Sequence, residues 1–149
     1  MMDSTKANEV IRAGPIEVRF RLDAEQTAGS MTMFEFSVPV RARVPVPHSH
    51  DAFDETVYGL EGIATWTLDG QKTRIGPGDV LFIPRGHVHQ FENLDTQDAR
   101  MLSVIAPGLL GPEYFREIGE VVNSGGPPNV ERIMEVMRRH GLRPAPPAA

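Results

Sequence analysis

The sequence predicts a single domain built mostly from β-strands, and three observations lead to this fold class. The chain has 149 residues, about the size of one ordinary domain. It contains 14 Gly and 13 Pro, and such a turn-rich composition favours many short strands over a few long helices. Hydrophobic residues make up 40% and charged residues 23%. This balance is typical of a globular protein with a real core.

Charge and composition exclude several classes of protein. The chain has 15 Lys and Arg against 20 Asp and Glu, and no basic run, so nucleic acid is not an expected partner. It has no cysteine, which excludes disulfides, thiol catalysis and iron–sulfur ligation. No apolar stretch approaches the roughly 18 residues of a membrane span. We therefore expect no membrane association and a cytoplasmic location.

Short alternating runs bounded by turn residues predict the strands, in chain order, at residues 16–22, 31–40, 55–60, 63–68, 71–75, 79–83, 88–91 and 99–105. Asp69-Gly70 lies between two alternating runs and predicts a type I′ hairpin turn, because both residues tolerate positive φ. Gly76-Pro77-Gly78 predicts another turn. The prolines in 39–47 make that segment an edge or a connection rather than a central strand.

Two amphipathic helices are expected after the last strand. Pro112 and Glu113 open the first, whereas Asn129 caps the second and Gly141 ends it. We expect both helices to close the end or flank of a β-barrel rather than to take a direct part in chemistry. The predicted organisation is a flexible arm at 1–14, the barrel at 15–106, a helical segment packing on it at 107–142, and a disordered Pro/Ala tail at 143–149.

Four of the five histidines occur in two tight pairs, His48-Ser49-His50 and His87-Val88-His89. Residues i and i+2 of a strand share a face, so His48 and His50 can present two imidazoles to one centre. The carboxylate of Glu55 can return to that centre on the next strand, and His89 would complete it. Three neutral nitrogens and one anionic oxygen suit a divalent first-row metal.

These residues fall into two spaced motifs. The first is Gly-x5-His-x-His-x4-Glu-x6-Gly, which is matched by His48, His50, Glu55 and Gly62, with Ala42 in place of the leading glycine. The second is Gly-x5-Pro-x-Gly-x2-His-x3-Asn, which is matched at every fixed position by Gly78, Pro84, Gly86, His89 and Asn93. The sequence thus resembles a small single-domain cupin, similar to the quercetin-dioxygenase-like cupins. The departure at Ala42 concerns a turn and not a metal ligand.

The resemblance implies an all-β cupin fold, a double-stranded β-helix or jelly-roll barrel, with one or two C-terminal α-helices. It also implies that His48, His50, Glu55 and His89 bind one divalent metal ion per chain. The ion is Fe, Mn, Ni, Co, Cu or Zn, and nothing in the sequence chooses among them. His87 lies in a turn, and we interpret it as a loop residue near the site rather than a fifth ligand.

The metal ligands are expected to face a pocket for a small organic molecule. Strand parity predicts that its wall contains Phe34, Phe36, Val57, Phe82 and Phe91. The same parity turns Gly59 inward, where it would leave room beside the metal, and turns Tyr58 and Leu60 outward. Apolar residues on the outer face are expected to be buried by another surface. The resemblance favours a second copy of the chain as that surface, so we expect a homodimer.

The first functional hypothesis is a dioxygenase-like, metal-dependent enzyme acting on a small aromatic or enolic substrate. It rests on the resemblance, because one fold hosts unrelated functions. An isomerase, epimerase or lyase that uses the metal as a Lewis acid is the main alternative. A non-catalytic barrel that binds a small molecule is the third. The sequence identifies neither the substrate nor any catalytic residue beyond the metal ligands.

Overall fold

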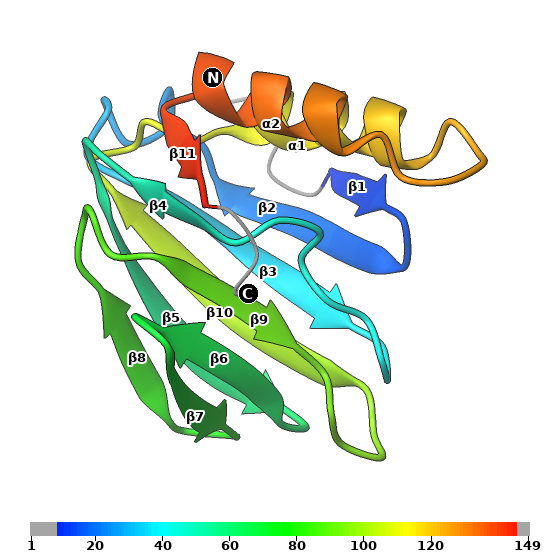
Figure 1. Ribbon diagram of the computed structural model, residues 1–149. Helices are drawn as coiled ribbons and strands as arrows, with labels where there is room; N and C mark the ends of the chain where they lie inside the picture. The colour runs from blue at the N-terminus through cyan, green and yellow to red at the C-terminus, as the bar shows by residue number, and fades with distance from the viewer. Residues whose placement is uncertain (1–8, 146–149) are drawn as a thin grey trace.

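The computed structural model describes residues 9–145, which form two antiparallel sheets packed face to face with two helices at one side (Figure 1). The larger sheet has the order β1 (Val10–Ala13), β2 (Ile16–Leu22), β3 (Thr32–Val38), β10 (Ala99–Ala106), β5 (Asp54–Glu61) and β8 (Val80–Ile83). The smaller sheet has the order β11 (Leu142–Pro144), β4 (His48–His50), β9 (His89–Glu92), β6 (Ala64–Leu68) and β7 (Gln71–Ile75). The predicted mostly β fold class is confirmed.

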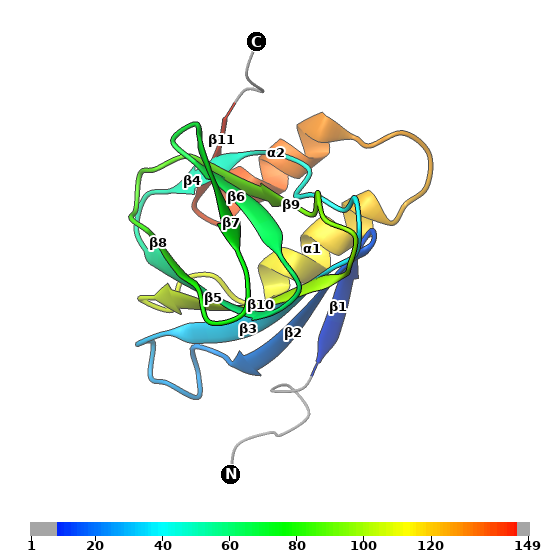
Figure 2. The ribbon, with the colours of Figure 1, turned by 90° about the horizontal axis from the view of Figure 1, so that it is seen from below.

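The two helices fill the open side between the sheets (Figure 2). As expected, α1 (Pro112–Val122) begins with proline, and the side chain of Asn129 caps α2 (Val130–Arg139) by accepting a hydrogen bond from the Arg132 backbone N–H at 3.2 Å. Each helix turns one apolar face inward, and the buried residues of these faces include Tyr114, Phe115, Ile118, Val121, Ile133, Val136 and Met137. Because the remaining faces are polar, each helix is amphipathic, and the helices close the barrel by burying their apolar faces.

Both ends of the described chain contain a strand that the sequence did not predict. The arm expected over residues 1–14 includes β1, which pairs with β2 in the register Ile11 to Val18. The tail expected over residues 143–149 begins within β11, which pairs with β4. Each strand is only three or four residues long, too short for an alternation signal. The rest of the predicted arm, 1–8, and of the tail, 146–149, lies outside the described residues.

Local turn chemistry follows the sequence closely. Asp69 and Gly70 have φ values of 50° and 82°, as the predicted type I′ turn requires. At the start of the first motif the left-handed residue is Arg41, at φ 72°, which directly precedes Ala42. Ala42 is buried and needs no positive φ. The missing glycine therefore leaves the turn intact.

Gly59 has a role other than the predicted one. A Cβ atom at this position would lie 1.9 Å from the carbonyl oxygen of Gly76. The backbone of Gly59 also donates to Asp79 O at 2.9 Å and accepts from the Gly78 N–H at 3.0 Å. Gly59 thus lets the turn at residues 76–79 approach strand β5, and the expectation that it leaves room beside a metal is wrong.

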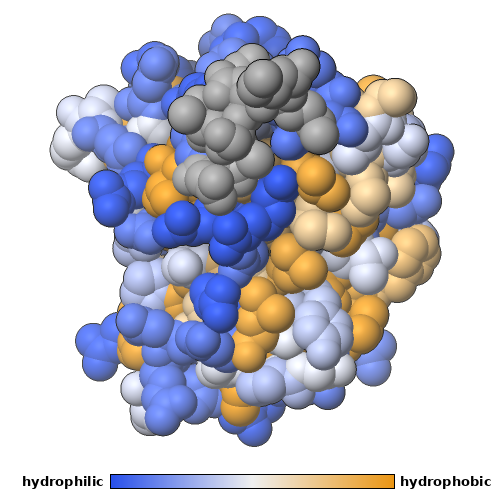
Figure 3. Space-filling view, turned by 180° about the vertical axis from the view of Figure 1, so that it is seen from behind, coloured by the Kyte–Doolittle hydropathy of each residue, from blue (hydrophilic) through white to orange (hydrophobic). Residues whose placement is uncertain are grey.

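Phe82 faces outward, which corrects its predicted place in the pocket wall. In the pairing of β5 with β8, Ile83 lies opposite Glu55 and Phe82 opposite Thr56, so Ile83 takes the inward position. Phe82 is 55% exposed, and Tyr58 and Val80 are 43% and 60% exposed. Figure 3 views the molecule from behind, where orange hydrophobic residues lie among blue hydrophilic ones. Among residues 9–145 no helix is long and apolar enough to cross a membrane.

We predict that Gly59→Ala destabilises the protein by about 3 kcal/mol, because the added methyl group forces the 76–79 turn away from β5. Gly70→Ala is the matched control. It has open space around the added atom and costs only about 1–2 kcal/mol for a left-handed backbone. Urea unfolding of both variants measures the difference, and equal losses would contradict the close-approach role of Gly59.

Candidate metal centre

Three histidines converge from two neighbouring strands of the smaller sheet. His48 and His50 lie on β4, and His89 lies on β9 directly opposite His48 in the register. One nitrogen atom from each imidazole lies within 4.8 Å of the other two. The i, i+2 spacing of the pair therefore places both side chains on the inward face, as predicted.

Backbone carbonyls orient two of the rings. His48 Nδ1 donates to Val46 O at 2.9 Å, and His89 Nδ1 donates to His87 O at 3.0 Å. A carbonyl oxygen only accepts, so the proton sits on Nδ1 and the lone pair on Nε2. Within the described residues, His89 Nε2 and His50 Nδ1 are buried without a hydrogen-bond partner. Buried polar atoms without partners are rare. The lone pair of His89 Nε2 is therefore available to a metal ion.

Glu55 approaches the histidines from the opposite sheet. Its Oε1 lies 3.6 Å from His89 Nε2 and 3.9 Å from His50 Nε2. Its other oxygen accepts a hydrogen bond from Ser103 Oγ on β10 at 2.8 Å. Ser103 is fully buried and orients the carboxylate. The sequence analysis did not single it out, although a serine between Met101 and Ile105 at an inward strand position is a detectable signal.

The protonation states suit a cation. Burial lowers the pKa of His48 to about 3, with smaller effects from the other two histidines, and burial lowers the pKa of His50 to about 4. Burial acts to raise the pKa of Glu55, but His89, His50 and Ser103 together lower it to about 2. At neutral pH His48 and His50 are therefore neutral imidazoles and Glu55 is an anionic carboxylate. This donor set fits a divalent first-row metal ion.

Strand β4 is held in place mainly by the C-terminal segment. It pairs with β9 at one position only, whereas β11 pairs with all three of its residues. Beyond β11, the Ala145 N–H donates to Pro47 O at 2.8 Å. Arg143 also forms an ion pair with Asp51 at 2.9 Å. Residues more than 90 positions away in the chain thus position two of the three histidines.

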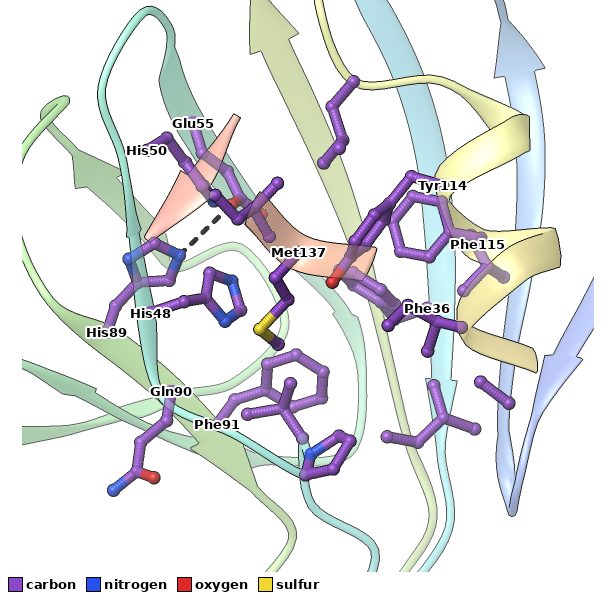
Figure 4. Close-up of a pocket in the computed structure, with 18 of the residues that line it drawn as sticks. Phe36, His48, His50, Glu55, His89, Gln90, Phe91, Tyr114, Phe115 and Met137 are labelled. Carbon is purple, nitrogen blue, oxygen red and sulfur yellow. Dashed lines mark ion pairs between the residues drawn. The ribbon is translucent and has the colours of Figure 1, made fainter. Parts of the chain in front are cut away.

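The histidines and Glu55 form the polar end of a cavity whose other walls are aromatic and aliphatic (Figure 4). Of the predicted wall residues, Phe34, Phe36 and Phe91 line it. Val57 is fully buried but does not line the cavity, because it lies two residues further along β5 than Glu55. Phe82 lies on the outside, as described above.

The helices contribute to this cavity, which the sequence did not predict. Tyr114, Phe115 and Ile118 come from α1, and Met137 comes from α2. Trp66 on β6 completes the aromatic wall and donates from Nε1 to the sulfur of Met101 at 2.9 Å. The inward helix faces were visible in the sequence as amphipathic patterns. Only the fold shows that they face the histidines.

The remaining histidines lie outside the centre. His87 is a loop residue whose ring bonds to Asp69, and its side chain is 47% exposed, in agreement with the interpretation that it is not a ligand. His140 ends α2 and lies 3.2 Å from Glu117. Two carboxylates within the span of the first motif form surface ion pairs, Asp51 with Arg143 and Asp54 with Arg85.

Two antiparallel sheets that enclose an inward cluster of three histidines define a β-barrel protein with a candidate metal site. The model of the cupin domain family matches residues 34–105. The chain therefore contains a cupin domain over these residues, and its fold is the jelly-roll barrel. The resemblance found in the two sequence motifs is confirmed.

Relatives with different names share this domain. Residues of the chain are 36% identical over 96 positions to quercetin 2,3-dioxygenase from Bacillus subtilis, a match that covers 64% of this chain and 28% of the relative. A predicted oxalate decarboxylase from Thermotoga maritima superposes with a TM-score of 0.61 and 27% identity, covering 66% of this chain and 90% of that one.

A sugar phosphate isomerase of the cupin superfamily from Silicibacter pomeroyi has a TM-score of 0.55 and 22% identity, over 62% of this chain and 59% of that one. At this identity the likeness concerns the fold alone. The chain also spans only 28% of the dioxygenase and 58% of a relative from Aquifex aeolicus. The cupin domain is therefore established, and the reaction is a matter for proposal.

We predict that the metal-free protein loses stability as the pH falls below about 6.5. The folded-state pKa values of His48 and His50, about 3 and 4, lie below the ordinary value near 6.5. The unfolded chain therefore binds these protons first, and acid favours unfolding. Below about 4.5 the lowered pKa of Glu55 adds to the loss in the same direction.

The urea-unfolding midpoint of chelator-treated protein, measured from pH 7.5 to 4.5, checks this prediction. His48→Gln should flatten the profile, because each proton contributes up to about 1.4 kcal/mol per pH unit. A midpoint that stays constant over this range in the wild-type protein would show that burial of the histidines is not linked to folding.

Proposed function

We propose that the protein is a metal-dependent, dioxygenase-like enzyme that acts on a small aromatic or enolic molecule. The observation that carries the proposal is that His89 Nε2, which is buried without a hydrogen-bond partner, lies 3.6 Å from the anionic Glu55 carboxylate, with His50 Nε2 3.9 Å from the same oxygen, at the end of an apolar cavity. A purely structural histidine would have a partner for its buried nitrogen. The match to a relative named quercetin 2,3-dioxygenase supports the same reaction class.

His48, His50, His89 and Glu55 would hold one divalent ion per chain. Such an ion supplies either one-electron chemistry with dioxygen or Lewis-acid polarisation of a substrate oxygen. The chain's own residues orient the ligands and shield the site from water. Ser103 holds the carboxylate of Glu55 in one orientation, and the aromatic wall, Phe36 and Phe91 included, excludes water from the space beside the ligands.

A lyase is the second candidate, because the Thermotoga maritima relative is named a predicted oxalate decarboxylase. The composition of the cavity argues against a small dianion or a phosphorylated sugar as substrate. No arginine or lysine is found among the described residues that line it, so an anionic group away from the metal would be buried without a counter-charge. The same wall suits an apolar aromatic molecule.

The first test is metal content, with His89→Ala and Glu55→Ala compared with His87→Ala. We expect about one ion per wild-type chain, near-complete loss in His89→Ala and a loss of affinity of at least tenfold in Glu55→Ala. His87→Ala removes an exposed imidazole outside the cluster and should keep the ion. Elemental analysis of the folded variants decides, and equal metal loss in His87→Ala would disprove the assigned ligand set.

Activity is tested by oxygen consumption with aromatic diols and enols, for protein loaded separately with each candidate ion. Wild-type protein should consume oxygen with at least one ion that changes oxidation state, and His89→Ala should not. Turnover with zinc under anaerobic conditions would instead favour the lyase.

We propose that the protein forms a homodimer through β8 and the outward apolar residues beside it. Within the described residues β8 pairs only with β5, so its other edge leaves backbone donors and acceptors free for the same strand of a second copy. Val80 and Phe82 would then each meet the partner's apolar surface. This self-complementary arrangement is typical of twofold symmetric dimers.

Light scattering coupled to size exclusion checks the oligomeric state. The wild-type protein should have twice the chain mass of 16.4 kDa, and Phe82→Asp should shift it to the monomer, because a charge at this interface is buried without a partner. Leu94→Asp, at a 63% exposed position outside β8, should leave the dimer intact. A monomeric wild-type protein would end the proposal.

A further inference from the structure

The cavity contains one tyrosine whose hydroxyl group has no structural explanation. Tyr114 lies in the first turns of α1 and is 5% exposed. Its ring packs edge-on against Phe115, with 5.0 Å between ring centroids, and against His140 at 5.5 Å. In Figure 4 its hydroxyl oxygen is directed toward the interior of the cavity from the side opposite the histidines.

Within residues 9–145 the hydroxyl group of Tyr114 makes no hydrogen bond. It is not among the fully enclosed unpartnered atoms, so its oxygen borders the open space of the cavity that Tyr114 lines. A tyrosine hydroxyl inside a protein usually has a partner. The ring contacts with Phe115 and His140 would be served equally by phenylalanine. The hydroxyl oxygen therefore gains its partner from whatever occupies the cavity.

Other polar groups of the cavity wall are already accounted for. The Trp66 N–H is used by Met101 Sδ, and Figure 4 shows the Gln90 amide pointing away from the labelled histidines and Tyr114. Among the described lining residues this leaves Tyr114 as the polar group that faces the interior away from the metal ligands. A few polar groups around an apolar space are the usual pattern of a small-molecule site.

Tyr114 stays neutral at any working pH, because burial, with a smaller contribution from the charge of Glu55, raises its pKa above the ordinary range. A neutral phenol can both donate and accept a hydrogen bond, and a donated bond requires an acceptor oxygen on the ligand. The absence of arginine and lysine among the described lining residues means that this oxygen belongs to an uncharged group, such as a carbonyl or an ether.

We propose that Tyr114 is a specificity-determining residue that donates a hydrogen bond to an uncharged acceptor oxygen of the ligand, at the end remote from His48, His50 and His89. The ligand class is then a largely apolar aromatic molecule with two oxygen functions. One binds at the metal ligands, and the other is a carbonyl or ether at Tyr114. This inference rests on the proposed function, and it adds the second recognition point.

Binding of two matched catechols to zinc-loaded protein tests the proposal without turnover. 4-Acetylcatechol carries a carbonyl oxygen opposite its two hydroxyl groups, and 4-ethylcatechol has the same shape without that acceptor. Tyr114→Phe should weaken the acetyl compound about fivefold to tenfold, the effect of one hydrogen bond, and leave the ethyl compound within about twofold. Tyr58→Phe changes the outward, 43% exposed tyrosine and should affect neither.

Isothermal titration calorimetry measures the six affinities of the three proteins for the two compounds, and elemental analysis of the same samples measures bound zinc. If the zinc-loaded Tyr114→Phe protein shows the same change in affinity for both compounds, or no change for either, the proposed role of Tyr114 is wrong. The metal centre is unaffected by this result. Wild-type protein that holds zinc but binds neither compound would overturn the ligand class. Protein that holds no zinc and binds neither compound would overturn the metal centre and this inference together.

Discussion

The structure depends above all on the burial of four ionisable side chains, His48, His50, Glu55 and His89, between two apolar sheets. Taking such groups out of water is costly unless each is hydrogen-bonded or coordinated. The carbonyls of Val46 and His87 satisfy one nitrogen on each of two rings. The buried Nε2 atom of His89, 3.6 Å from Glu55, is left without a hydrogen-bond partner in the described residues, and a bound cation is a partner that suits this position.

Elements from distant parts of the chain hold the four side chains of the cluster in position. β4, with three residues, is too short to be rigid by itself, and β11 from the C-terminal segment holds it along its length. In the opposite sheet, Ser103 on β10 orients Glu55 on the neighbouring strand β5 by a hydrogen bond. The two helices then seal the apolar side of the cavity. Three of the four candidate ligands therefore lie close together in sequence, within residues 48–55, but the positions of all four are a property of the whole fold.

The relatives of this domain carry different names, including a dioxygenase and a predicted oxalate decarboxylase. The ligand cluster alone does not separate such reactions, because the same ion site can supply redox or Lewis-acid chemistry. The wall of the cavity is more selective. Its aromatic lining, its lack of cationic side chains among the described residues and the inward hydroxyl of Tyr114 together favour an uncharged aromatic ligand.

By itself, the sequence determined the mostly β class, the hairpin at Asp69-Gly70 and the convergence of the histidines, because strand parity and turn chemistry act over a few residues. Only the tertiary structure decided features that depend on register and on contacts distant in the chain. The register between β5 and β8 places Phe82 on the outer face. Gly59 is needed where the backbone of Gly76 approaches β5 closely. Likewise, helix docking placed Tyr114 in the cavity. Periodicity identifies which face of an element is apolar, but packing determines what that face meets.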